Sequence, residues 1–96
     1  MDKILIVEVS KSLAFALKST FEESDDISCF ICHNMAEVKA LINDHIDFSI
    51  ALINLQLPDA PDGEIINLLN VYDIPIVILT GSDDIKIRRL MHQKAS

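Results

Sequence analysis

Four short apolar runs, separated by stretches in which apolar residues recur at helical spacing, constrain the fold of this chain more than any other feature. The runs are Lys3–Glu8, Ile27–Cys32, Ser49–Asn54 and Pro75–Leu79. Apolar runs of this length are typical of strands that are buried on both faces of a parallel sheet. The alternation of such strands with helices predicts a doubly wound α/β fold, whose functional crevice lies at the carboxyl ends of the strands.

The stretches between the runs carry signals for where helices begin. Asn34 and Glu37 have the spacing of a capping box, so a helix is expected after Asn34. A further helix is expected after Gly63, and Ser82 or Asp83 is expected to cap a last helix. The apolar residues that mark the first helix are Leu13, Ala16, Leu17 and Phe21, and those that mark the last are Ile85, Ile87, Leu90 and Met91.

Composition narrows the class of protein. A length of 96 residues allows one domain at most. The net charge is −7, from 15 acidic and 8 basic residues, and this excess of acid disfavours nucleic acid and anionic membranes as partners. The sequence has no apolar run near the roughly 20 residues of a membrane helix and no signal-peptide pattern. We therefore expect a cytoplasmic protein.

Cys29 and Cys32 have the spacing of a redox or metal-binding pair, but they lie within an apolar run that is predicted to be a strand. Residues three apart on a strand point to opposite faces. The sequence therefore favours two separate, buried thiols over a disulfide or a shared metal.

The residues after the third run indicate a particular family. Asn54 is followed by a Leu-x-Leu-Pro turn at 55–58 and by an Asp-Gly pair at 62–63, just before the third expected helix. This layout resembles the response-regulator receiver domain of two-component signalling, which has a flavodoxin-like fold. The resemblance implies parallel strands in the order 2-1-3-4-5 and a phosphorylation site at the carboxyl ends of strands one and three.

The resemblance also implies roles for single residues. Glu8 matches the first of two adjacent acids that hold Mg²⁺, and Val9 stands where the second acid belongs. Asn54 stands at the phosphoacceptor position, the backbone carbonyl of Gln56 matches a further metal ligand, and Thr80 matches the switch hydroxyl. The lysine that follows strand five in the family has no counterpart.

The two substitutions conflict with the chemistry of the family. The carboxamide of Asn54 cannot form an acyl phosphate, and Glu8 is the one carboxylate left for a metal that prefers several. We expect Mg²⁺ binding to be lost or very weak, no other cofactor, and no enzymatic activity. With the metal role lost, the sequence favours Glu8 as a strand-end acid that binds a neighbouring helix N-terminus. Asn54 could form a turn, and Thr80 could cap the last helix.

The family fold is longer than this chain. We expect a single domain over 1–96 that is incomplete at its C-terminus, with four strands in the order 2-1-3-4 and without the fifth strand and last helix. Strand four would then be an apolar edge, and exposed apolar edges pair with other chains. Self-association through strand four, or completion by the rest of a longer protein, is expected.

Three functions remain open at this point. The first is a degenerate bacterial receiver, or pseudo-receiver, that regulates a protein partner or output domain without phosphorylation. The second is an ordinary phosphoreceiver of a longer response regulator, inactivated by the residues at positions 9 and 54. The third is a small ligand-binding flavodoxin-like domain. Against it, the sequence has no glycine-rich loop and few aromatic residues that could bind a ring.

Overall fold

The computed structural model describes residues 2–80 and 86–89, with Thr80 and 86–89 described through their backbone. The strands are β1 (Asp2–Val7), β2 (Ile27–Cys32), β3 (Ile50–Ile53), β4 (Ile76–Thr80) and β5 (Lys86–Arg89), and the helices are α1 (Lys11–Phe21), α2 (Met35–Asn43) and α3 (Glu64–Val71). None of these helices is long and apolar enough to cross a membrane.

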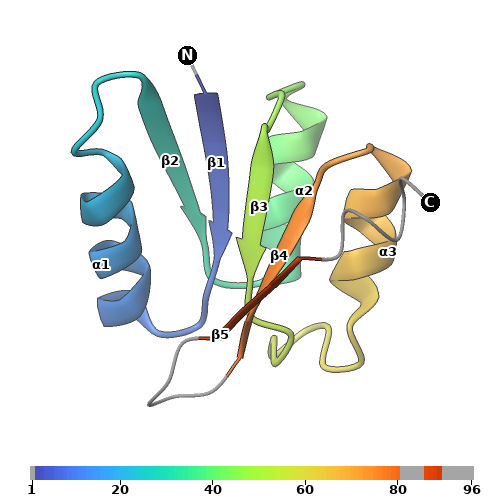
Figure 1. The fold of residues 1–96 in the computed structure, drawn as a ribbon. Helices are drawn as coiled ribbons and strands as arrows, with labels where there is room; N and C mark the ends of the chain where they lie inside the picture. The colour runs from blue at the N-terminus through green and yellow to red at the C-terminus, as the bar shows by residue number, and fades with distance from the viewer. Residues whose placement is uncertain (1, 81–85, 90–96) are drawn as a thin grey trace.

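The strands form one sheet in the order β2-β1-β3-β4-β5. The first four strands are parallel, so the predicted flavodoxin-like arrangement 2-1-3-4 is confirmed. Helix α1 covers one face of the sheet, and α2 and α3 cover the other (Figure 1). Parallel strands joined by crossover helices bring their carboxyl ends to one edge, which places the predicted site there.

The prediction of a last helix is wrong over 86–89. These residues form β5, which pairs antiparallel with β4 in the register Leu79↔Ile87 and Thr80↔Lys86. A stretch of four residues with one apolar position fits a strand as well as a helix, and the unpaired backbone groups of β4 favour the strand. The other residues assigned to that helix, Ser82, Asp83, Ile85, Leu90 and Met91, lie outside the described residues.

Strand β5 also changes the expected edge of the sheet. The outer side of β4 was predicted to be exposed, but its backbone groups pair with Lys86–Arg89 of the same chain. The edge strand on this side is therefore β5. Whether the chain associates with itself stays a prediction.

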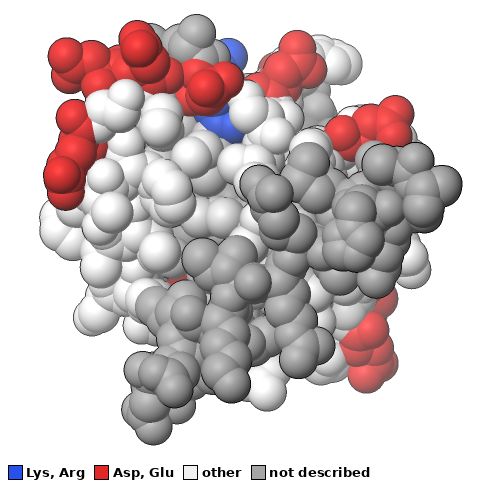
Figure 2. All heavy atoms as spheres, in the orientation of Figure 1, with Lys and Arg blue, Asp and Glu red and all other residues white. Residues whose placement is uncertain are grey.

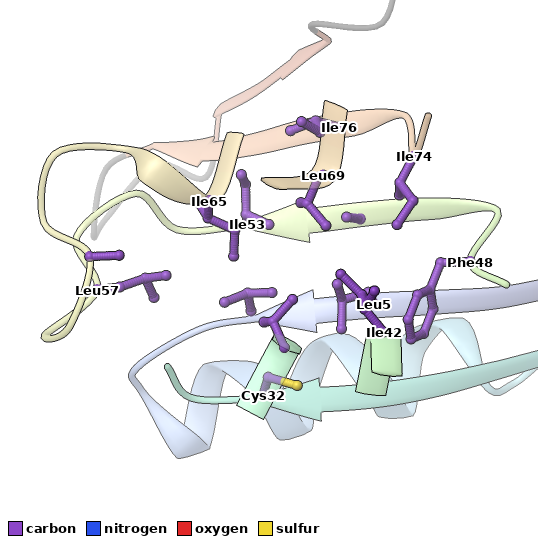
Figure 3. Close-up of a cluster of buried hydrophobic side chains, with 14 of the residues drawn as sticks. Leu5, Cys32, Ile42, Phe48, Ile53, Leu57, Ile65, Leu69, Ile74 and Ile76 are labelled. Atoms are coloured by element: carbon purple, nitrogen blue, oxygen red, sulfur yellow. The ribbon is translucent and has the colours of Figure 1, made fainter. Parts of the chain in front are cut away.

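Two apolar clusters hold the helices against the sheet. The larger one lies between the sheet and the α2 and α3 layer and includes Leu5, Ile53, Ile65 and Cys32 (Figure 3). The smaller one lies beneath α1 and includes Cys29. The two cysteines thus occupy opposite faces of β2 as free, buried thiols, as their spacing predicted.

Local capping follows the sequence closely. The Ser10 side chain accepts a hydrogen bond from the Leu13 N–H at 3.3 Å and caps α1. The Asn34 side chain caps α2 by accepting from the Glu37 N–H at 2.9 Å. Gly63 precedes α3 with a φ of 79°, a left-handed conformation in which glycine is the least strained residue.

Candidate functional site

The site lies where β1 and β3 end side by side. Val7 pairs with Ile53 in the sheet, so the next residues, Glu8 and Asn54, leave the sheet at the same edge. The Asn54 N–H donates to the Val7 carbonyl at 2.8 Å, and the Glu8 N–H donates to the Cys32 carbonyl at 3.0 Å. The ladder therefore fixes both backbones at this point and limits where their side chains can lie.

Glu8 is the one buried charged residue among those that the structure describes, with 3% of its surface exposed. Its carboxylate accepts a hydrogen bond from the Ser10 N–H at 2.8 Å. The Asn54 Nδ2 lies 3.2 Å from Oε1 and 3.4 Å from Oε2. These donors replace the water that burial removes, and hydrogen bonds to a charged group are among the stronger ones in proteins.

The amide of Asn54 is satisfied at both ends. Its Oδ1 accepts from the Gln56 N–H at 2.8 Å, while its Nδ2 donates to Glu8. Because a backbone N–H needs an acceptor and a carboxylate needs a donor, this network fixes the orientation of the amide. Asn54 thus forms the turn after β3, and Glu8 binds the N-cap residue of α1. These are the structural roles that the sequence offered for the two residues.

His33 belongs to the site, although the sequence analysis did not single it out. Its Nδ1 lies 2.8 Å from the backbone carbonyl oxygen of Glu8. A carbonyl only accepts, so Nδ1 carries the hydrogen in this contact. His33 directly follows β2, the neighbour of β1, and its place at the same sheet edge was the available signal.

The side chains of Val9 and Gln56 do not join this network, to which Gln56 contributes only its backbone N–H. Val9 lies in the loop before α1 with 45% of its surface exposed, and it offers no ligand atom on its side chain. Gln56 is exposed in the loop after β3, where its N–H bonds Asn54. The backbone of Thr80 ends β4, and its side chain is outside the described part of the structure.

These residues do not fit a Mg²⁺ site of the receiver kind. Both oxygens of Glu8 already accept hydrogen bonds, Val9 is apolar, and Asn54 turns its nitrogen rather than its oxygen toward Glu8. Mg²⁺ is usually held through carboxylates and retains a strict octahedral shell. Within residues 2–79, no three His, Cys, Asp or Glu side chains gather closely enough to hold a metal ion.

Asp59 anchors the loop that borders the site. Its carboxylate accepts from the N–H groups of Met35 at 2.9 Å and Ala36 at 3.1 Å, in the first turn of α2. The hydrogen bond from Met35 is the largest cause of the lowered pKa of Asp59. Asp59 is exposed, and its carboxylate binds the positive end of α2.

Comparisons with known proteins bear on the fold. No family model matches the sequence, and no curated protein is significantly similar to it. The structure is similar to that of a sensor protein from Polaromonas sp. JS666, with a TM-score of 0.69 and 22% identity over 80% of this chain. It is also similar to the beryllofluoride-activated NtrC4 receiver domain dimer, with a TM-score of 0.72 and 22% identity over 88% of this chain.

These likenesses show that the chain has the receiver-domain fold, as its strand order and its motif predicted. The chain spans 63% of the length of the sensor-protein structure and 71% of the NtrC4 receiver. A sequence identity of 22% shows a shared fold and no more, so the activity has to be inferred from the residues of the site.

Proposed function

We propose that this chain is a receiver-like regulatory module of bacterial two-component signalling that acts by protein contact and without phosphorylation. It has the fold of a receiver domain and an amide at the phosphoacceptor position. The observation that carries the proposal is the hydrogen bond from Asn54 to Glu8. It joins the two strand ends that the phosphorylation chemistry of a receiver would need to keep open for a metal and a phosphoryl group.

The electrostatics of the site support this proposal. A receiver pocket with several carboxylates depends on a cation to relieve their repulsion. Here one carboxylate has no acidic neighbour at position 54 and instead accepts hydrogen bonds from the neutral amide of Asn54 and from the Ser10 N–H, so no repulsion needs relief by a cation. The module thus has one stable arrangement of its site, and its activity would be set by its abundance and its partner. A cytoplasmic protein partner or output domain fits this role.

Two exposed apolar side chains in and before α1 offer a contact surface for such a partner. Phe15 lies on α1 with 68% of its surface exposed, off the apolar stripe that packs on the sheet. Val9, 45% exposed, lies in the loop that leads into the same helix. Exposed aromatic side chains are frequent anchors of protein interfaces.

Treatment with acetyl phosphate and Mg²⁺ tests the proposal, with the mass of the intact protein as the readout. The wild-type chain is expected to gain no phosphoryl group. The matched control is the double variant Val9→Asp/Asn54→Asp, which restores carboxylates at both positions and would be labelled if the fold retains the rest of a working site. Labelling of the wild-type chain would overturn the proposal.

A further inference from the structure

A hollow of about 170 Å³ opens at the edge where the strands begin, at the opposite end of the sheet from Glu8 and Asn54. It lies between the end of α2, the segment leading into β3 and the segment leading from α3 into β4. Both segments reverse direction at a residue in the left-handed region, His45 with a φ of 61° and Asp73 with a φ of 57°. The apolar lining consists of Ile42, Ile46, Phe48, Tyr72 and Ile74.

The hollow is acidic and lacks a cation of its own. Asp47 lines it, and its carboxylate forms no hydrogen bond or ion pair with any residue that the structure describes. Helices α2 and α3 both end beside it, and neither has a basic residue in its last turn to offset the negative end of its dipole. Among the described residues, no lysine or arginine lines the hollow.

The surrounding surface has the same sign. Acidic residues lie at the start of β1 and in the segments that lead into β2, β3 and β4, and Figure 2 shows carboxylates gathered along this upper edge of the molecule, with a small amount of basic surface between them. A partner with positive charge would be drawn to this edge and away from the rest of the sheet. The residues concerned include Asp2, Glu22, Glu23, Asp25, Asp26, Asp44 and Asp47.

We propose that this hollow binds an arginine side chain presented by a protein partner. The aliphatic part of arginine would pack on the isoleucines of the wall. Its planar guanidinium would stack on the ring of Tyr72, which is 52% exposed, and form paired hydrogen bonds with Asp47. A cavity of about 150 Å³ holds a molecule the size of benzene, so the space suits one such group.

Other side chains fit the hollow less well. An apolar side chain would bury Asp47 without a partner, which is costly. Lysine carries a compact, strongly hydrated charge that cannot pair in a fork with a carboxylate. A second copy of this chain could supply Arg88 or Arg89, the only arginines of the sequence, but two copies that each carry a net charge of −7 repel one another. We therefore assign the arginine to a different protein.

The test is a titration of the full chain with the peptide acetyl-Ala-Leu-Arg-Leu-Ala-amide, followed through backbone amide chemical shifts. Citrulline in place of arginine provides a neutral probe of the same shape. The shifts are expected at 42–48 and 72–74, with binding at least tenfold weaker for the citrulline peptide. Equal binding of the two peptides, or shifts confined to other segments, would overturn the proposal.

Two single-charge variants distinguish a built site from general attraction. Asp47→Asn is expected to weaken binding of the arginine peptide at least fivefold. Asp44→Asn removes the same charge from the C-cap of α2, outside the lining, and is expected to change binding less than twofold. Equal losses in both variants would contradict the proposal. The proposal would also be contradicted if sedimentation showed that the wild-type chain associates with itself and that Asp47→Asn abolishes this association. The hollow would then bind a second copy of the chain.

Discussion

The side-chain nitrogen of Asn54 lies 3.2 Å from Oε1 of Glu8, and this contact joins the ends of β3 and β1 at the centre of the candidate site. A carboxylate at position 54 would face Glu8 with a like charge at the same distance. The amide therefore supplies the donor that a buried carboxylate needs, where a receiver with two acids would need a cation.

Replacing Asn54 with Asp should destabilise the fold in the absence of metal by about 1–3 kcal/mol, because Glu8 loses a donor and gains a repelling neighbour. The repulsion raises the pKa of one carboxyl of the pair in the folded state. The folded state then binds more protons than the unfolded one, so the destabilisation should grow as the pH rises above about 4. Urea unfolding from pH 4 to pH 8 measures it.

The double variant Glu8→Gln/Asn54→Asp provides the control for this effect. It removes one of the two charges while keeping the size of both side chains, so the growth of the destabilisation with pH should largely disappear. A pH dependence that is the same in the single and double variants would show that repulsion between positions 8 and 54 is not its cause.

Asp59→Asn should lower stability, because Asp59 accepts from two N–H groups at the start of α2 and its pKa is lowered. Because the pKa of Asp59 is lower in the folded state, its carboxylate contributes its full stabilisation above the ordinary pKa near 3.8. This stabilisation is lost as the pH falls through the lower pKa of the folded state. The free energy of unfolding of Asp59→Asn should therefore lie below that of the wild type by a constant amount from pH 5 to pH 7, and by a smaller amount below pH 4.

The matched control is Asp62→Asn in the same loop, whose carboxylate forms no hydrogen bond or ion pair with the described residues. In thermal unfolding at pH 6, the melting temperature of Asp62→Asn should be close to that of the wild type, and the melting temperature of Asp59→Asn should be lower. Equal effects of the two substitutions would mean that only net charge matters in this loop.

Cys29 and Cys32 should react slowly with thiol reagents in the folded protein. Burial, followed by the nearby Glu37, raises the pKa of Cys32 to about 12, and burial followed by Glu22 raises the pKa of Cys29. Little thiolate exists at pH 8 as a result, and access is restricted. Both thiols should react quickly in urea, and mild oxidation should not link them. Fast reaction of either thiol in the native protein would contradict this arrangement.

Removing residues 81–96 should promote self-association, because the outer edge of β4 would lose its pairing with β5. Unpaired strand edges with apolar side chains are templates for other chains. Light scattering coupled to size-exclusion chromatography, over a concentration series, compares the shortened and full chains. A shortened chain that stays monomeric wherever the full chain does would show that β5 is dispensable as an edge cover.

The sequence allowed the parallel part of the fold to be predicted because each buried strand is a compact apolar run with a polar residue at its end. The cap at Asn34 was likewise predictable, since a cap depends on residues only three positions apart. Strand β5 was not predicted, because four residues match both helical and strand periods and the pairing partner lies elsewhere in the chain.

The site was predictable in part for a similar reason. Glu8 and Asn54 follow their strands directly, so the topology alone brings them together. The contacts of His33 and Asp59 join segments that are 25 and 23–24 residues apart in sequence, and no local pattern encodes them. Long-range contacts of loop residues depend on how the loops fold back, which the periodicity of strands and helices does not specify.

We propose that Asn54 and Glu8 close the site without a metal or a phosphoryl group. The most direct measurement records backbone amide spectra of the full chain as Mg²⁺ and then beryllofluoride are added, with Val9→Asp/Asn54→Asp as the comparison. The signals of residues 8–10 and 54–56 are expected to stay in place in the wild-type chain. Saturable shifts of these signals at millimolar Mg²⁺, or on addition of beryllofluoride, would contradict it.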